Sequence, residues 1–453
     1  FHRGGRARHA PGCGGGDRAM NIIRFLPRFR EISAALQQYE QRESWTQSDL
    51  QEYQLERINT VWTHARCNVP YYRNLQLPDA FASLSEYSHL MPVLKKATVR
   101  DQPDQFLSRQ AAAGSWHRSG GSTGKPTSFY WEHESHREVL RAKYRCEQAH
   151  GIDVFDRKVF LWGHTGSLGN GWKGRTAQWR QSLFDTLRGR TRLSAYDLDD
   201  ASLESMLGRI RRSNARSLYG YSSAIDLLAN AALDQQEQFP DLSLVIMTSE
   251  PADKSMRDRV SAVFQCPTVI EYGAAECNVI AYTMPDGKLR TRDDVVMVET
   301  TPNAVGTHDV LLTLLSNKSF PLLRYAIEDT TSAPIDRQGP GFGTLSDIRG
   351  RANDVLVGRS GSVVHPMLVK HVVEVIPRIR RFRAHQHETG DLNLTIEAGE
   401  SVSTKNLESV RVSLQSVLEG YPVRIETVDR IPGNLAGKHR WVICDMVNHR
   451  ATG

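Results

Sequence analysis

The sequence has few cysteines, no long hydrophobic run and little excess of charge of either sign. Its 453 residues include six cysteines, with no Cys-x-x-Cys pair, which excludes a disulfide-rich scaffold and a zinc ribbon. No run approaches the roughly 18 apolar residues of a membrane span. Apolar residues make up 40% and charged residues 24% of the chain, which excludes wholesale disorder. Together these features predict a cytoplasmic protein with reduced thiols.

The basic excess is small and unevenly placed. Lysine and arginine number 57 against 51 acidic residues, a net charge of +6 that would usually suggest nucleic acid or a membrane surface. Half of this excess lies in residues 1–19, which hold six glycines and four arginines against one aspartate. They predict a disordered leader, native or added, before Met20. The rest of the chain therefore predicts neither nucleic acid nor membrane as a partner.

Hydrophobic periodicity predicts an α/β fold. Apolar residues recur three and four apart from Met20 to about Leu107, which predicts helices. A loop of small residues follows at 111–128, and then a long helix through His150. Beyond it, short apolar runs alternate with helical patterns, which argues for a core with much parallel sheet, and residues 293–345 are β-rich. The clearest strands and helices of this core are Lys158–Trp162, Leu203–Arg211, Ser223–Leu233 and Leu244–Met247.

A second boundary is predicted near residues 349–353, after which the pattern fits a compact α+β module of about 100 residues. We therefore expect a leader at 1–19, a large core at 20–350 and a small domain at 351–453. The elements predicted for the small domain are strand Val355–Val357, helix Lys370–Val375, strands Ile379–His385 and Leu392–Ile396, helix Thr404–Leu418 and strand Val423–Val428.

The strongest motif is the Gly- and hydroxyl-rich segment Ser119–Thr127, SGGSTGKPT. Glycines let backbone N–H groups approach phosphates closely, hydroxyls add donors, and Lys125 supplies positive charge. A Walker A loop is excluded, because Ser119 stands at its first glycine position and Pro126 follows the lysine. The segment predicts a phosphate-binding loop of another kind.

Further motifs follow this loop in a fixed order. They are Leu218–Ala224, Thr248–Glu250, Glu271–Glu276 after the apolar stretch Thr268–Ile270, Pro321–Tyr325 leading to Asp329, Gly350–Asp354 and Ile431–Lys438. In this order the chain resembles the adenylate-forming superfamily, and within it the phenylacetate–CoA ligase and capsule-biosynthesis branch, from about residue 30 to 445. The resemblance implies a large multi-layer α/β core that binds ATP and an acid, and a small C-terminal α+β domain that moves.

The resemblance also implies a role for each motif. The ATP-binding residues would be Ser119, Gly120, Gly121, Ser122, Thr123, Gly124, Lys125, Tyr272, Gly273, Asp329 and Arg351. Glu276 would help to hold Mg²⁺, Asp329 would accept hydrogen bonds from the ribose, and Lys438 would bridge the carboxylate and the α-phosphate. Asn353 would stand at the hinge, and the acyl pocket would be lined by His164, Tyr219, Tyr221, Ser249, Ala274 and Ala275. Two departures from the family pattern are Glu328, where glycine is usual, and Gly433-Asn434, where Arg-Thr is common.

The chemistry explains these residue types. A carboxylate that attacks the α-phosphate of ATP brings two anions together, so Lys125, Lys438 and Mg²⁺ would offset their repulsion. A carboxylate is already ionised at neutral pH and needs no general base. The expected product is an acyl-adenylate, whose acyl group then passes to a thiol, with CoA as the default acceptor. An amine, a hydroxyl or a carrier protein stays open as acceptor, and proteins of this branch often form homodimers.

Other interpretations fit the sequence less well. A nucleotide-binding regulator without turnover is opposed by the retained Glu276 and Lys438. A serine hydrolase would use Ser222 in an imperfect nucleophile elbow, but that serine fits a helix N-cap better. A dinucleotide-binding site at Gly169–Gly174 is opposed as well. The segment matches G-x-G-x-x-G, but no helix pattern follows it. His385 and His387 lack a further ligand at zinc-site spacing, so a strand end explains them better than a metal. The basic residues Arg378, Arg380, Arg381 and Arg383 fit a solvated face that would attract CoA phosphates.

Overall fold

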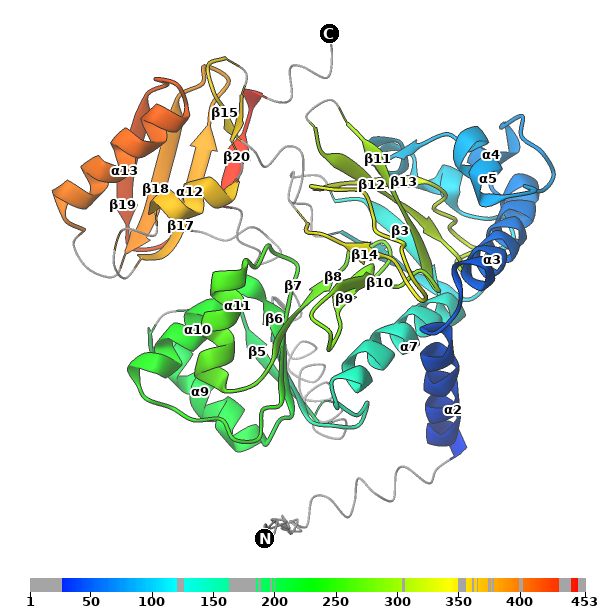
Figure 1. Ribbon diagram of the computed structural model, residues 1–453, viewed down its shortest axis with the longest axis horizontal. Helices are drawn as coiled ribbons and strands as arrows, with labels where there is room; N and C mark the ends of the chain where they lie inside the picture. Colours follow the sequence, from blue (N-terminus) through cyan, green and yellow to red (C-terminus); the bar gives the residue numbers. More distant parts are fainter. Residues whose placement is uncertain are drawn as a thin grey trace, which may run out of the picture.

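A computed structural model of the protein describes residues 27–119, 126–162, 185, 189–195, 198, 200–303, 306–348, 356–360, 362–364, 366–373, 376, 379–398, 402–431 and 441–446. The expected α/β architecture is confirmed (Figure 1). No described helix is both long and apolar enough to cross a membrane. The described cysteines Cys67, Cys146, Cys266, Cys277 and Cys444 are free thiols.

The helices predicted for the first hundred residues are present. They are α2 (Pro27–Arg42), α3 (Gln47–Asn68), α4 (Pro70–Arg73), α5 (Leu84–Leu90), α6 (Lys96–Asp101) and the 3₁₀ turn η1 (Pro103–Phe106). A capping box starts α3, because the Thr46 hydroxyl accepts from the Asp49 N–H while the Asp49 carboxylate accepts from the Thr46 N–H at 2.9 Å. The sequence pattern did not reveal the two-residue strand β1 (Leu94–Lys95) directly before α6.

An eight-stranded sheet forms the centre, in the order β14-β10-β9-β8-β7-β6-β4-β5. Its parallel half is β4 (Lys158–Trp162), β5 (Arg190–Ser194), β6 (Ser217–Tyr221), β7 (Leu244–Thr248) and β8 (Thr268–Tyr272), connected by α9 (Asp200–Ser213), α10 (Ser222–Asp234) and α11 (Lys254–Phe264). Strands β9 (Ala281–Thr283), β10 (Leu289–Thr291) and β14 (Thr344–Leu345) extend it antiparallel. The strands and helices predicted for this core are confirmed within a few residues.

Both faces of the sheet are covered at β7, which explains why this strand is buried along its whole length. Along β7, Leu244 and Ile246 join the cluster that includes residues of α3 and α7 (His133–Ala149). Val245 and Met247 join the cluster formed with α9, α10 and α11. In Figure 1 these three helices (green) lie on one side of the sheet, and α7 approaches from the other.

A second sheet packs beside the first, in the order β1-β13-β12-β11. It consists of β11 (Val296–Pro302), β12 (His308–Leu314) and β13 (Tyr325–Thr331), with β1 parallel to β13. The pairing of β12 with β13 shifts between Asp309 and Leu311, which pair with Thr330 and Ala326, so β13 bulges between those two residues. This bulge displaces three residues of β13 from the ladder.

The prediction of a loop at 111–128 is wrong in part, because this segment contains a strand. Strand β2 (Gly114–Arg118) pairs antiparallel with β3 (Ser128–Glu132), from Gly114↔Glu132 to Arg118↔Ser128. Small residues and glycines dominate the composition of this stretch and conceal its alternation. The described strands on either side of the glycine-rich segment are therefore paired.

The last hundred residues form a separate sheet in the order β19-β18-β17-β20. The elements are β15 (Leu356–Val357), β16 (Val363–Val364), α12 (Pro366–Val373), β17 (Ile379–Gln386), β18 (Leu392–Ala398), α13 (Thr404–Val417), β19 (Val423–Val428) and β20 (Val442–Cys444). A third hydrophobic cluster, from Leu356 to Val442, is built from these residues, and the partly buried Trp441 packs against both this cluster and that of α9–α11. The short strands β16 and β20 were not predicted.

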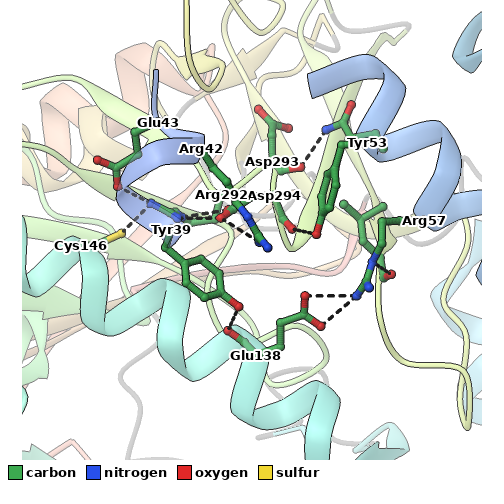
Figure 2. A network of polar contacts seen from close by, with 12 residues as sticks. Tyr39, Arg42, Glu43, Tyr53, Arg57, Glu138, Cys146, Arg292, Asp293 and Asp294 are labelled. Carbon is green, nitrogen blue, oxygen red and sulfur yellow. Dashed lines mark hydrogen bonds and ion pairs between the residues drawn. The ribbon is translucent and has the colours of Figure 1, made fainter. Parts of the chain in front are cut away.

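A buried charge network ties the N-terminal helices to the core (Figure 2). The Arg292 guanidinium, 1% exposed, donates to Glu43, directly after α2, and to the buried Asp294, each at 2.9 Å. It also contacts the thiol of Cys146 on α7, and burial raises the pKa of this thiol to about 12. Because a buried charge without its partner is strongly destabilising, this network fixes how α2 lies against α7 and the β10–β11 connection.

Candidate active site

The carboxyl ends of the parallel strands meet at one edge of the central sheet, where ligands bind in open α/β folds. Register pairs Tyr221 at the end of β6 with Thr248 at the end of β7, and Thr248 with Glu271 of β8. Ser249 and Tyr272, two residues predicted to belong to the site, therefore stand at this edge. Sequence positions more than 20 residues apart become neighbours here because the strands are parallel.

The paired strands β2 and β3 flank the predicted phosphate loop in the sequence. Its base is closed by the Ser119 N–H, which donates to the Thr127 carbonyl, and by the Thr127 N–H, which donates to the Ser119 hydroxyl, each at 2.9 Å. Further along β3, the Trp131 indole N–H donates to the carbonyl of Ala275 at 3.2 Å. The hairpin is thus tied to the turn that follows β8.

Two crossed tyrosine–carboxylate hydrogen bonds join that turn to β13. Tyr272 at the end of β8 donates to Asp329 at 2.8 Å, and Tyr325 at the start of β13 donates to Glu276 at 3.1 Å. Burial, together with the neighbouring carboxylates, raises the pKa of both phenols well above the usual range, so they remain hydrogen-bond donors at neutral pH. The tyrosines thereby hold Asp329 and Glu276, two of the predicted site residues, in one place.

The bulge of β13 explains how Asp329 leaves the ladder. Glu328, directly before it, has a φ of 73°, the left-handed conformation that costs a non-glycine residue about 1 kcal/mol or more. Glycine is usual in the family at this position, and the backbone supplies the physical reason. Glu328 is exposed, so its side chain points away from the packed core while Asp329 reaches Tyr272.

Sequence reasoning missed Lys96, which forms an ion pair with Glu276 at 3.1 Å. Lys96 begins α6, directly after β1, and the parallel pairing of β1 with β13 brings it beside Tyr325. The two charged side chains are 12% and 3% exposed. No local pattern could reveal a partner 180 positions away in the sequence.

We expect Lys96→Met to destabilise the protein, because it leaves the buried carboxylate of Glu276 without its cation. The expected loss is about 3 kcal/mol in the free energy of unfolding, measured by chemical denaturation. Lys95→Met is the matched control, because Lys95 is exposed and should change this free energy by less than about 0.5 kcal/mol. Equal effects of the two variants would contradict the importance of the pair.

Gly273 is required by the tight turn after β8. A Cβ atom there would lie 1.9 Å from the carbonyl oxygen of Asn278, a backbone atom that cannot swing away. We expect Gly273→Ala to displace this turn and to lower any ATP-dependent activity at least tenfold, since small misplacements of a site are costly. In the control Gly208→Ala, on α9, the added methyl meets only the far end of the Arg212 side chain, and activity should be unchanged. Steady-state kinetics of both variants would test this.

The expected acyl pocket has a polar wall that the sequence did not indicate. Tyr219 donates to Glu271 at 2.8 Å, and Glu271 pairs with the buried Lys143 of α7, also at 2.8 Å. The Lys143 ammonium lies 4.0 Å from the centre of the Tyr219 ring, and Trp162 stacks on the same ring with centroids 5.7 Å apart. Burial and the Glu271 carboxylate raise the pKa of Tyr219 above its usual range. These contacts hold Tyr219 in position.

The remaining described pocket residues differ in exposure. Ala275 is exposed, and Ala274 and Ser249 are partly exposed, with Ser249 in the left-handed conformation at a φ of 69°. Tyr221 is 2% exposed and packs against Trp162, with ring centroids 4.3 Å apart and ring planes tilted by 34°. Its ring therefore belongs to the packing between β4 and β6.

Ser222 does not have the setting of a hydrolytic nucleophile. It is the first residue of α10 and fully buried, and its hydroxyl donates to the Glu250 carbonyl at 3.0 Å. The predicted N-cap at Ser222 is wrong by one position, because Tyr221 occupies the N-cap without a side-chain cap. A nucleophile elbow requires an exposed hydroxyl, so this geometry opposes the serine hydrolase.

Several predicted residues lie outside the described part of the chain. They are Gly120, Gly121, Ser122, Thr123, Gly124 and Lys125 of the phosphate loop, His164, the G-x-G-x-x-G segment Gly169–Gly174, Arg351, Asn353 and Lys438. Their roles remain predictions. The described site therefore consists of the loop base, the turn after β8, the β13 bulge and the wall around Tyr219.

Comparison with known sequences gives the same branch that the motifs indicate. Protein CapK of Staphylococcus aureus is 23% identical over 327 residues, which cover 70% of this chain and 71% of CapK. The phenylacetate–coenzyme A ligase of Escherichia coli K12 is 24% identical over 359 residues, covering 72% and 76% of the two chains. No protein-family model matches the sequence.

Comparison with solved structures finds proteins with the same fold as this chain. A 2-hydroxyisobutyryl-CoA ligase in its postadenylation state aligns with a TM-score of 0.69 at 19% identity, covering 91% of this chain and 93% of that one. The same ligase in its thioesterification state aligns with a TM-score of 0.59 at 19% identity, covering 91% and 94%. The chain therefore has the adenylate-forming fold, and its sequence is similar to CapK and to phenylacetate–coenzyme A ligase.

Proposed function

We propose that this protein activates a carboxylic acid with ATP to an acyl-adenylate and transfers the acyl group to a thiol, with CoA as the default acceptor. The observation that carries the proposal is the pair of crossed hydrogen bonds, Tyr272 to Asp329 and Tyr325 to Glu276. These bonds fix two acidic groups beside the hairpin of the glycine-rich loop, at the sheet edge where ligands bind. The E. coli relative, which joins phenylacetate to CoA by its name, supports the reaction class.

In the first step, a carboxylate oxygen of the acid attacks the α-phosphorus of ATP and displaces pyrophosphate, which leaves an acyl-AMP. Asp329 would accept hydrogen bonds from the ribose hydroxyls, and Tyr272, whose ring borders it, would line the nucleotide site. The loop from Ser119 to Lys125 would hold the phosphates by backbone N–H groups and the lysine charge. In the second step, a thiol sulfur attacks the acyl carbon and AMP leaves.

Magnesium fits the chemistry of Glu276. Its carboxylate supplies the hard oxygen ligand that Mg²⁺ prefers, and both contacts described for it, with Lys96 and Tyr325, are made by the same oxygen, Oε1. When bound, Mg²⁺ would offset the negative charge of the phosphates. Glu276 would hold the ion, Tyr325 would fix the orientation of the carboxylate, and Lys96 would remain as a second positive charge beside it.

We propose further that residues 20–350 hold ATP and the acid, and that residues 351–453 form a mobile domain, with the leader at 1–19 outside both. The third hydrophobic cluster, which draws its buried members from Leu356 to Val442, supports an independent small domain. Asn353 would stand at the hinge, and Lys438 would be carried toward the site for the first step. The pocket would be lined by His164, Tyr219, Tyr221, Ser249, Ala274 and Ala275.

The experiment is release of pyrophosphate from ATP across a panel of aromatic and aliphatic acids. The proposal expects release that depends on the acid and on Mg²⁺, and that falls strongly in Glu276→Gln. Absence of release with every acid, together with unchanged ATP binding in Lys125→Ala, would overturn it and favour a regulator. Chromatography of the products with CoA, a carrier protein and amines then identifies the acceptor.

A further inference from the structure

The fold brings two histidines and an aspartate together on the outer face of the C-terminal sheet. His385 Nε2 lies 2.8 Å from Asp445 Oδ2, and His387 Nδ1 lies 4.0 Å from the same oxygen. All three offered ligand atoms lie within 4.8 Å of one another. The sequence supplied only the two histidines, because Asp445 is about 60 positions further along the chain.

Strand geometry explains why the three side chains meet. Residues 385 and 387 are two apart and lie on the same face at the end of β17, while Gln386 between them is fully buried on the other face. Strand β20 runs parallel to β17, with Gln386 opposite Cys444, so that Asp445 comes next to His387. The Asp445 N–H donates to the Gln386 carbonyl at 2.9 Å and fixes this register.

Hydrogen bonds of the Gln386 side chain hold the backbone between the two histidines. The Gln386 side chain exchanges two hydrogen bonds with the backbone of Val357 in β15, each at 2.8 Å. It also donates to the Gly390 carbonyl at 3.1 Å. A buried residue bonded in this way gives the two histidines a rigid base, which lowers the cost of ordering them around an ion.

We propose that His385, His387 and Asp445 form a binding site for a divalent transition metal of the zinc class. Two imidazoles and one carboxylate suit zinc, cobalt or nickel, whereas magnesium and calcium prefer sites made only of oxygen. Tetrahedral zinc with bonds of about 2.0–2.2 Å places its ligand atoms roughly 3.4 Å apart, between the two separations found here. The three groups are each about one third exposed, so water can complete the coordination.

An amide side chain lies beside the site. The Asn393 amide nitrogen Nδ2 lies 2.9 Å from His387 Nε2, the ring nitrogen that would not coordinate. With a metal at Nδ1, Nε2 would carry the proton, and the amide rotated by 180° would present its oxygen to accept it, as partners of metal-bound histidines do. Arg381 and Arg383 continue the same face of β17 away from the site.

Such an ion would join the end of β20 to β17. Only three residues of β20 pair with β17, and the segment 432–440, which contains Lys438, immediately precedes Trp441 and this strand. A metal at Asp445 would therefore hold the chain just beyond that segment. This role is structural and independent of the proposed ATP chemistry.

The test is titration of the full chain, without an affinity tag, with zinc chloride, followed by calorimetry and by the absorption spectrum of the cobalt-substituted protein. We expect one equivalent to bind at this site and to raise the thermal unfolding midpoint, with magnesium chloride at the same concentration giving no such shift. His387→Ala and Asp445→Asn should each weaken this binding at least tenfold. His89→Ala, which removes an exposed histidine far from the site in sequence, is the control and should bind like the wild type.

The remaining histidines and Cys13 are common to all variants, so a difference between variants reports on this site alone. Loss in both site variants with retention in His89→Ala supports the proposal. Equal binding by wild type, His387→Ala and Asp445→Asn would overturn it, as would equal loss in His89→Ala. Circular dichroism of each variant establishes that it is folded, and Asp445→Asn keeps the shape of the side chain if His387→Ala does not fold.

Discussion

Asp329→Ala is expected to lower kcat/KM for ATP by about 100-fold or more. An acceptor carboxylate that binds two ribose hydroxyls contributes about 1.5–3 kcal/mol for each hydrogen bond. Loss of both corresponds to at least a factor of about 100, at 1.36 kcal/mol for each tenfold change. The loss should appear mainly as a higher KM for ATP, while the KM for the acid changes little. Steady-state kinetics with each substrate varied in turn measures this.

Two neighbouring variants give this prediction its control. Tyr272→Phe removes the phenol that donates to Asp329 at 2.8 Å, and it should give a smaller loss, near tenfold, because the carboxylate remains but is less fixed. Glu328→Gln removes the adjacent exposed charge and should leave the kinetics of ATP unchanged. A loss in Glu328→Gln as large as that in Asp329→Ala would mean that general charge, and not ribose binding, is responsible.

Lys438→Ala is expected to separate the two half-reactions. The resemblance gives this lysine a role only in adenylation, where its charge bridges two anions, and removal of such a group typically costs about 100- to 1,000-fold. Formation of the thioester from preformed acyl-adenylate should fall less than tenfold, because the acyl carbon is already activated. Single-turnover measurements of each step provide the two numbers.

The matched control is Lys405→Ala, which removes an exposed lysine from α13 in the same part of the chain. It should leave both half-reactions unchanged. Equal losses of both steps in Lys438→Ala would contradict the assigned role. They would instead indicate that the variant disturbs the segment before β20, where Trp441 packs against two hydrophobic clusters.

Elements with a strong hydrophobic period could be predicted from the sequence. Strand β4 matches its predicted bounds, Lys158–Trp162, and β19 matches Val423–Val428. Strands of two or three residues, such as β1 and β20, have no period to detect. Strand β2 was hidden by the small residues of the hairpin. Strands β1 and β20 nevertheless position Lys96 and Asp445, which pair with residues far away in the sequence.

The site was predictable only where a motif stands in one continuous segment. Tyr272, Glu276 and Asp329 could be named from the order of the motifs, but their partners could not. Tyr325 belongs to a predicted motif, yet its bond to Glu276 depends on how β13 lies against the turn after β8. Lys143 and Lys96 look like ordinary helix lysines in the sequence. Tertiary packing alone brings them to buried carboxylates.

The most direct measurement uses carboxylic acids labelled with ¹⁸O in both carboxylate oxygens. If the carboxylate attacks the α-phosphorus of ATP and the acyl carbon is then attacked by a thiol, the C–O bond breaks and the bridging oxygen stays on AMP. We therefore expect AMP with one ¹⁸O atom, detected by mass spectrometry, for every thioester formed. Unlabelled AMP, or ¹⁸O appearing in inorganic phosphate together with ADP, would contradict it.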